Sequence, residues 1–165
     1  MDSSVAAGWS NFLVVSAGAA ATLAGLLFVA ISINLARIIE LPGISGRAAE
    51  ALILLSCTLA ATLVALVPHL SAMQLGLALL VITLPAWIVP MSIQVESIRR
   101  RTYLQTSHVV SRGLLHQVAT LPGVFAGLSL CGLLPGGLAW LGLGAIASML
   151  VAILSAWVLL VEILR

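Results

Sequence analysis

The stretch LAWLGLGAIASMLVAILSAWVLLVEI occupies residues 138–163 and contains a single charged side chain, that of Glu162. A helix needs about 20 apolar residues to cross about 30 Å of hydrocarbon, so this stretch is long enough to span a bilayer. Four earlier stretches have a similar length and apolar character, and they cover residues 11–36, 49–71, 75–98 and 109–133. We therefore predict an all-α polytopic transmembrane helix bundle with five spans, formed by residues 1–165 as one domain.

The composition of the chain agrees with a membrane protein. Of its 165 residues, 62% are hydrophobic and 7% are charged, and the mean hydropathy is +1.24. A water-soluble domain of this composition would lack the polar surface that solvent requires, so the lipid bilayer is the first expected partner. The net charge of +2 comes from a few arginines at the span edges. That arrangement indicates contact with anionic head groups, and we expect no nucleic-acid partner.

The arginines predict how the spans are oriented. Arg37 and Arg47 lie in the first connection, residues 99–101 in the third, and Arg165 after the last span, whereas the second and fourth connections contain none. With five spans, these three places lie on one side of the membrane. Because positively charged loops stay in the cytoplasm, we expect the N-terminus outside and the C-terminus inside, in a bacterial cytoplasmic (inner) membrane. We also expect the first span to be retained, because it is too long for the apolar region of a signal peptide.

Prolines interrupt two of the predicted spans. Pro85 and Pro90 lie in the third span and Pro122 in the fourth. Each removes a backbone hydrogen bond, so these positions are the expected hinge points of the bundle. Pro122 and the turn at residues 135–137 also leave open a four-span arrangement, in which span four or span five is re-entrant.

Polar side chains gather in the halves of the spans that the charge pattern places toward the cytoplasm. Charged groups inside a membrane pair with one another or line a polar pathway. Arg112 and His116 lie one helical turn apart, and Glu162 is the expected partner of Arg112 because spans four and five form a short hairpin. We therefore expect either interhelical pairing or a polar cytoplasmic vestibule. The candidate residues are Asn34, Gln94, Glu96, Arg112, His116 and Glu162.

Small residues recur at four-residue intervals in three spans. Such stripes let helix backbones approach closely, and close packing is a main cause of helix association in lipid. Three stripes exceed what packing within a five-helix chain requires, so we expect a homo-oligomer. The helix-packing candidates are Ala17, Ala21 and Gly25 in span one, Gly123 and Gly127 in span four, and Gly144, Ser148 and Ala152 in span five.

Sequence patterns of known catalytic sites are missing from the chain. It has no GxSxG, HExxH or CxxC motif, no glycine-rich phosphate loop, and a single aspartate, at residue 2. Cys57 and Cys131 both fall in predicted spans, where they are interpreted as small apolar core residues. We expect no enzymatic activity, no cofactor and no metal site.

One family resemblance is visible in the first third of the chain. Residues 17–35 read AGAAATLAGLLFVAISINL, and they are followed by LPG at 41–43 and RAAEAL at 47–52. This pattern resembles a family of small bacterial multi-pass membrane proteins, some of which are labelled modulator of FtsH protease. The resemblance implies a membrane-protein partner in the inner membrane and implies no site residues.

Two functions from different classes fit these observations. The first is a non-enzymatic integral membrane protein that acts through helix packing, as a homo-oligomer or as a binder or regulator of another membrane protein. The alternative is a small homo-oligomeric ion channel or transporter with a polar cytoplasmic vestibule.

Overall fold

The computed structural model describes residues 7–40, 44–99 and 106–164, and their side chains over 8–40, 45–92 and 113–161. The first described element is a short 3-10 helix, η1, over Ala7–Trp9. Six α-helices follow: α1 over Ser10–Ile33, α2 over Leu35–Glu40, α3 over Ile44–Ala65, α4 over Ala72–Arg99, α5 over Thr106–Leu130 and α6 over Leu138–Leu164.

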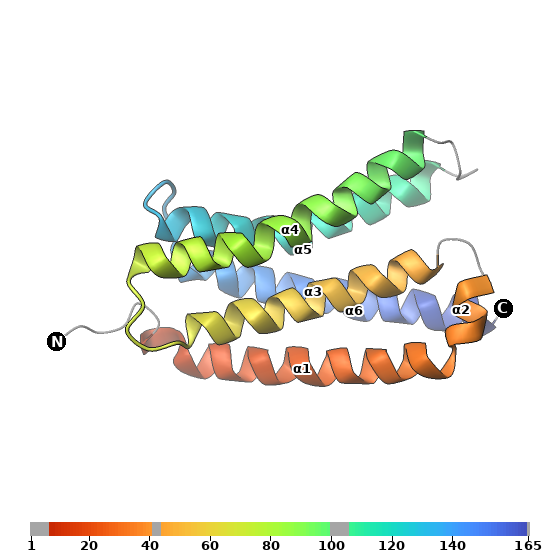
Figure 1. Cartoon of the computed structure of the whole chain (residues 1–165), viewed down its shortest axis with the longest axis horizontal. Helices are drawn as coiled ribbons and strands as arrows, with labels where there is room; N and C mark the ends of the chain where they lie inside the picture. The colour runs from red at the N-terminus through yellow and green to blue at the C-terminus, as the bar shows by residue number, and fades with distance from the viewer. Residues whose placement is uncertain (1–6, 41–43, 100–105, 165) are drawn as a thin grey trace.

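The predicted fold class is confirmed. Five helices, α1, α3, α4, α5 and α6, are long and apolar enough to cross a membrane, and the described residues contain no strand. Helix α1 begins at one end of the bundle and α6 ends at the other, as an odd number of spans requires (Figure 1). We call the end that holds the start of α1 the N-side and the end that holds α2 the C-side.

The helices form three layers. In Figure 1, α1 lies along one side, α3 and α6 occupy the middle, and α4 and α5 lie together on the other side. Helix α1 packs mainly against α3, whereas α5 packs against both α4 and α6. Toward the C-side, α4 and α5 lean away from the other helices (Figure 1). Helix α1 is therefore a peripheral helix, and α5 is enclosed on two sides.

The second span is shifted relative to its predicted bounds. We expected residues 49–71, but α3 begins at Ile44 and ends at Ala65. Proline at position 68 has no backbone N–H, and its ring would clash with the carbonyl four residues earlier, so continuing the helix through it is unfavourable. The chain leaves the helix in a tighter turn, in which Leu66 N–H donates to the Leu63 carbonyl at 3.1 Å.

The first span also ends earlier than expected, because the helix breaks at Asn34. The side-chain amide of Asn34 donates to the Ala30 carbonyl at 2.9 Å, and its backbone N–H is shared between the Ala30 and Ile31 carbonyls. A side-chain donor that competes for a helix carbonyl weakens the regular ladder at that point. The chain then changes direction into α2, which lies across the C-side (Figure 1).

The prolines that were expected to be hinges lie inside continuous helices. Pro85 and Pro90 are within α4, and Pro122 is within α5. Helix α4 changes direction along its length (Figure 1), as a helix does where proline removes a hydrogen bond. Helices α5 and α6 each run unbroken across their apolar stretches, which fits the five-span arrangement better than a re-entrant segment.

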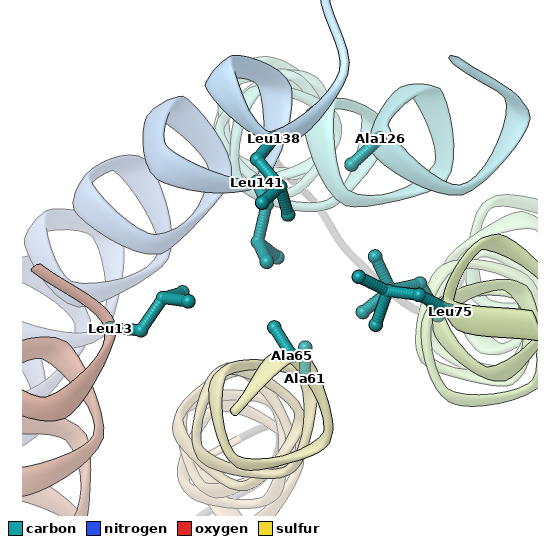
Figure 2. Close-up of a cluster of buried hydrophobic side chains, with 8 residues drawn as sticks. Leu13, Ala61, Ala65, Leu75, Ala126, Leu138 and Leu141 are labelled. Carbon is teal, nitrogen blue, oxygen red and sulfur yellow. The ribbon is translucent and has the colours of Figure 1, made fainter. Parts of the chain in front are cut away.

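Buried side chains from all five long helices meet at the N-side. Figure 2 shows them pointing toward a common centre, with Leu13 from α1, Leu75 from α4 and Leu141 from α6 opposite the small side chains of α3 and α5. A second cluster, at the C-side, contains side chains of α1, α2, α3 and α6 and, within residues 45–92 and 113–161, none from α4 or α5. Among the side chains that the structure describes, all five long helices therefore contribute to the N-side cluster and fewer to the C-side cluster.

Candidate functional site

An exposed face of small residues runs along α1. Gly18, Ala21 and Gly25 are exposed, and a methyl group added to either glycine would meet no atom within 4 Å. At 100° per residue these three positions point to the same side of the helix. The buried residues Leu13 and Ala20 lie on the opposite side. We call Gly18, Ala21 and Gly25 the α1 face.

The predicted stripe in span one is divided between the interior and the surface of the bundle. Ala17 is only 6% exposed and packs inside the bundle, whereas Ala21 and Gly25 face outward. A step of four residues turns the helix by about 400°, so a stripe at that interval rotates by about 40° per step. Over two steps this rotation carries the stripe from the interior to the surface.

The small residues of α5 and α6 are used inside the chain. A methyl group on Gly144 of α6 would lie 3.2 Å from the backbone nitrogen of Gly123 in α5. One on Gly76 of α4 would lie 2.8 Å from the carbonyl oxygen of Gly127 in α5. The backbones of α4, α5 and α6 approach too closely for larger side chains. These two predicted stripes are buried within the chain.

Ser148 and Ala152 complete the internal packing of α6. The Ser148 hydroxyl donates to the Ala119 carbonyl of α5 at 2.9 Å, and Ala152 is 2% exposed. A hydrogen bond between helices in a membrane contributes about 0.6 kcal/mol on average. Ser148 therefore joins α5 to α6 both by its small size and by this bond.

A group of buried hydroxyls lies between α3, α4, α5 and α6. Thr58, Thr83, Thr120 and Ser148 line a cavity of about 30 Å³. Each threonine donates to a carbonyl four residues earlier in its own helix, so the hydroxyl oxygens keep only acceptor capacity toward the cavity. Such a volume has room for about one or two waters. Single threonines in an apolar span gave no signal that they would come together.

The structure does not bring the described members of the predicted vestibule together. Asn34 lies at the end of α1, and His116 is 3% exposed within α5. The layer of α3 and α6 separates these two helices (Figure 1). The side chains of Gln94, Glu96, Arg112 and Glu162 lie outside the described residues. The pairing of Arg112 with Glu162 therefore stays a prediction.

A polar contact that the sequence did not predict joins α4 to α5. The Trp87 indole N–H donates to the Gln117 side-chain oxygen at 2.6 Å, and the Gln117 amide lies 3.3 Å from the Met91 sulfur. Trp87 and Gln117 are thirty positions apart in sequence. Only the tilt and rotation of the two helices place them opposite one another.

The sequence also did not reveal a groove that opens between α1 and α6. Its volume is about 400 Å³, its lining is apolar except for Asn34, and its floor includes Leu55 of α3. The α1 face and this groove are two surfaces at which the described chain could bind another molecule.

No protein-family model, no curated protein and no solved structure matches the chain.

Proposed function

We propose that this chain is a non-enzymatic, multi-pass protein of the bacterial inner membrane that self-associates through the α1 face. The observation that carries the proposal is the exposure of Gly18, Ala21 and Gly25 along one side of a peripheral helix. In lipid, apolar faces gain nothing from leaving water, so helices associate where their backbones can approach closely. The α1 face allows that approach and has no partner within the described chain.

The other small-residue stripes support the same choice of interface. Gly123, Gly127 and Gly144 are buried against neighbouring helices and are not accessible to a second molecule. Elsewhere the exposed surface of the spans carries larger side chains, such as Leu150 and Trp157 of α6. A second copy can approach most closely along α1.

A different membrane protein is the alternative occupant of the α1 face. The resemblance to proteins labelled modulator of FtsH protease makes a membrane-bound protease one partner to test. Such a partner would use the same close backbone approach, so the same substitutions would disrupt its binding.

A channel or transporter is the second candidate function. The hydroxyl-lined cavity among Thr58, Thr83, Thr120 and Ser148 is the observation that favours it, because hydroxyl acceptors can replace part of the hydration of a cation. Ion flux into liposomes that contain the purified protein tests it directly. Flux equal to that of empty liposomes would remove this candidate.

The self-association proposal is tested by filling the α1 face with bulk. Ala21→Leu and Gly25→Leu should shift the protein to monomers in nanodiscs and mild detergent, as measured by native mass spectrometry. Ala139→Leu is the matched control, because Ala139 is an exposed residue of α6 away from the α1 face. A monomeric wild type, or Ala21→Leu and Ala139→Leu proteins that associate equally, would contradict the proposal.

The proposed orientation has its own test. In a background lacking Cys57 and Cys131, we would introduce Leu133→Cys at the N-side or Glu40→Cys at the C-side, both at exposed positions. Because the arginine-rich connections should be cytoplasmic, a membrane-impermeant maleimide should label intact cells carrying the first variant and not the second. The reverse labelling would invert the orientation.

A further inference from the structure

The groove lies along the C-side halves of α1 and α6, where its lining runs from Leu23 to Asn34 and from Ala152 to Leu160. At the N-side, a methyl group on Gly142 of α6 would lie 3.6 Å from the ring of Phe12 in α1, so the two helices are in contact there. Toward the C-side, the lining contains the small side chains of Ala30, Ala152 and Ala156. These side chains are too short to fill the space between the helices, which leaves the volume of about 400 Å³.

The groove is closed on the side that faces the bundle interior and open on the outer side. Leu55 of α3, which is 2% exposed, forms part of the floor, and Ile38 of α2, at 3%, lies at the C-side end. Leu26 of α1 and Trp157 of α6 form the rims, and each is 65% exposed. The groove therefore opens sideways, toward the hydrocarbon that surrounds the spans.

The length of the groove matches one leaflet of a bilayer. Its lining on α1 extends from Leu23, near the middle of the helix, to Asn34 at its end. At 1.5 Å per residue this distance is about 17 Å, close to half of the roughly 30 Å hydrocarbon thickness. A transmembrane helix would need a groove through both leaflets, whereas a lipid acyl chain occupies one. The dimensions favour an acyl chain.

The polar end of the groove lies where a lipid head group would be. Asn34 is the polar lining residue, and the exposed Arg37 follows one turn later, beside Ile38. A guanidinium binds phosphate oxygens through paired hydrogen bonds. Lipid tails are as apolar as the groove, so moving an acyl chain from the bilayer into the groove hardly distinguishes one lipid from another. Selectivity must come from the head group.

We propose that the groove between α1 and α6 binds one acyl chain of an anionic phospholipid, with its phosphate at Arg37. The groove lies on the side of α1 away from the α1 face, so this site does not depend on self-association. Substitutions in the α1 face should leave lipid binding unchanged, and substitutions in the groove should leave the oligomeric state unchanged.

The test is native mass spectrometry of detergent-purified protein mixed with equal amounts of phosphatidylglycerol and phosphatidylcholine of the same chain length. The wild type should retain one lipid per protomer and should favour phosphatidylglycerol at least fivefold. Ala156→Trp should abolish this retention by filling the groove. Ala139→Trp, the matched control on the same helix outside the groove lining, should retain it. Arg37→Gln should keep a bound lipid but lose the preference.

Thermal unfolding identifies groove variants that fail to fold, and Ala30→Phe provides a second way to fill the space from α1. Retention of one lipid by folded Ala156→Trp and Ala30→Phe proteins would overturn the proposal. Equal retention of the two lipids by the wild type would overturn the role of Arg37. Loss of oligomers in the groove variants, with lipid retained, would show that the groove is a protein interface instead.

Discussion

Helices α1 and α5 carry similar small-residue patterns and use them in opposite ways. In α5, methyl groups added to Gly123 and Gly127 would both meet α4, at 3.0 Å from Thr83 and 2.7 Å from Leu80, so these neighbours would have to move. In α1, Gly18 and Gly25 face open space. A GxxxG-like pattern thus indicates that a helix can be approached closely, but it does not say whether the approaching helix belongs to the same chain.

The position of each helix in the bundle explains the difference. Helix α5 lies against both α4 and α6, so its small residues meet backbones on two sides. Helix α1 lies at the edge and packs mainly on α3, which leaves its far side without a neighbour in the described chain. The following substitutions compare these two environments.

The largest effect should come from Gly76→Ala, which adds a methyl group at the contact between α4 and α5. That group would lie 2.8 Å from both the Cys131 sulfur and the Gly127 carbonyl oxygen, so the helices must separate. Overpacking of this kind costs about 1 to 3 kcal/mol. The midpoint of thermal unfolding in detergent should fall.

The matched control is Gly25→Ala in the α1 face, where the added methyl group has space. Alanine is a better helix former than glycine by up to about 1 kcal/mol, so the unfolding midpoint should stay unchanged or rise. If both alanine variants shift the midpoint in the same direction, the contrast between the two helices is wrong.

A smaller effect is expected for Ser148→Ala, which removes the hydrogen bond from α6 to the Ala119 carbonyl of α5. Interhelical hydrogen bonds in membranes contribute about 0.6 kcal/mol on average and up to about 1.7 kcal/mol. Thr22→Ala is the control, because the Thr22 hydroxyl bonds only to the Gly18 carbonyl of its own exposed helix. The free energy of unfolding should fall for Ser148→Ala and change by less than about 0.5 kcal/mol for Thr22→Ala.

The smallest effect on stability, but a change in shape, is expected for Asn34→Leu. Without the side-chain amide, the Ala30 carbonyl would accept only the backbone N–H of residue 34, so the helical ladder should be regular there and α1 should continue toward α2. Spin labels at the exposed positions Val15 and Ile39 should move apart, toward the roughly 36 Å of a continuous helix. An unchanged distance would assign the break to the packing of α2 and not to Asn34.

Much of the fold could be predicted from local sequence. Apolar length identified the five spans, and the turn residues near Pro68 and Pro135 located two connections. The errors were local as well. The second span ends at Ala65, three residues before Pro68, and the first breaks at Asn34, which we had placed inside it as a residue for interhelical contact.

The candidate sites were less predictable than the spans. The sequence identified Ala21 and Gly25 as packing residues without showing that they face outward, and it grouped Asn34 with His116 although α3 and α6 lie between their helices. The groove between α1 and α6 had no sequence signal, because Ala30 and Ala152 are ordinary residues of apolar spans.

The sequence by itself determined that the helices are apolar, how many of them are long enough to span a membrane, and where most of them end. These properties depend on hydrophobic length and on helix-breaking residues, which act locally. Only the tertiary structure decided which faces meet, which small residues are buried and where the groove between α1 and α6 lies. In lipid, one apolar face is as well solvated as another, so hydrophobicity does not select the contacts. The rotation and tilt of each helix, set by packing against its neighbours, decide them.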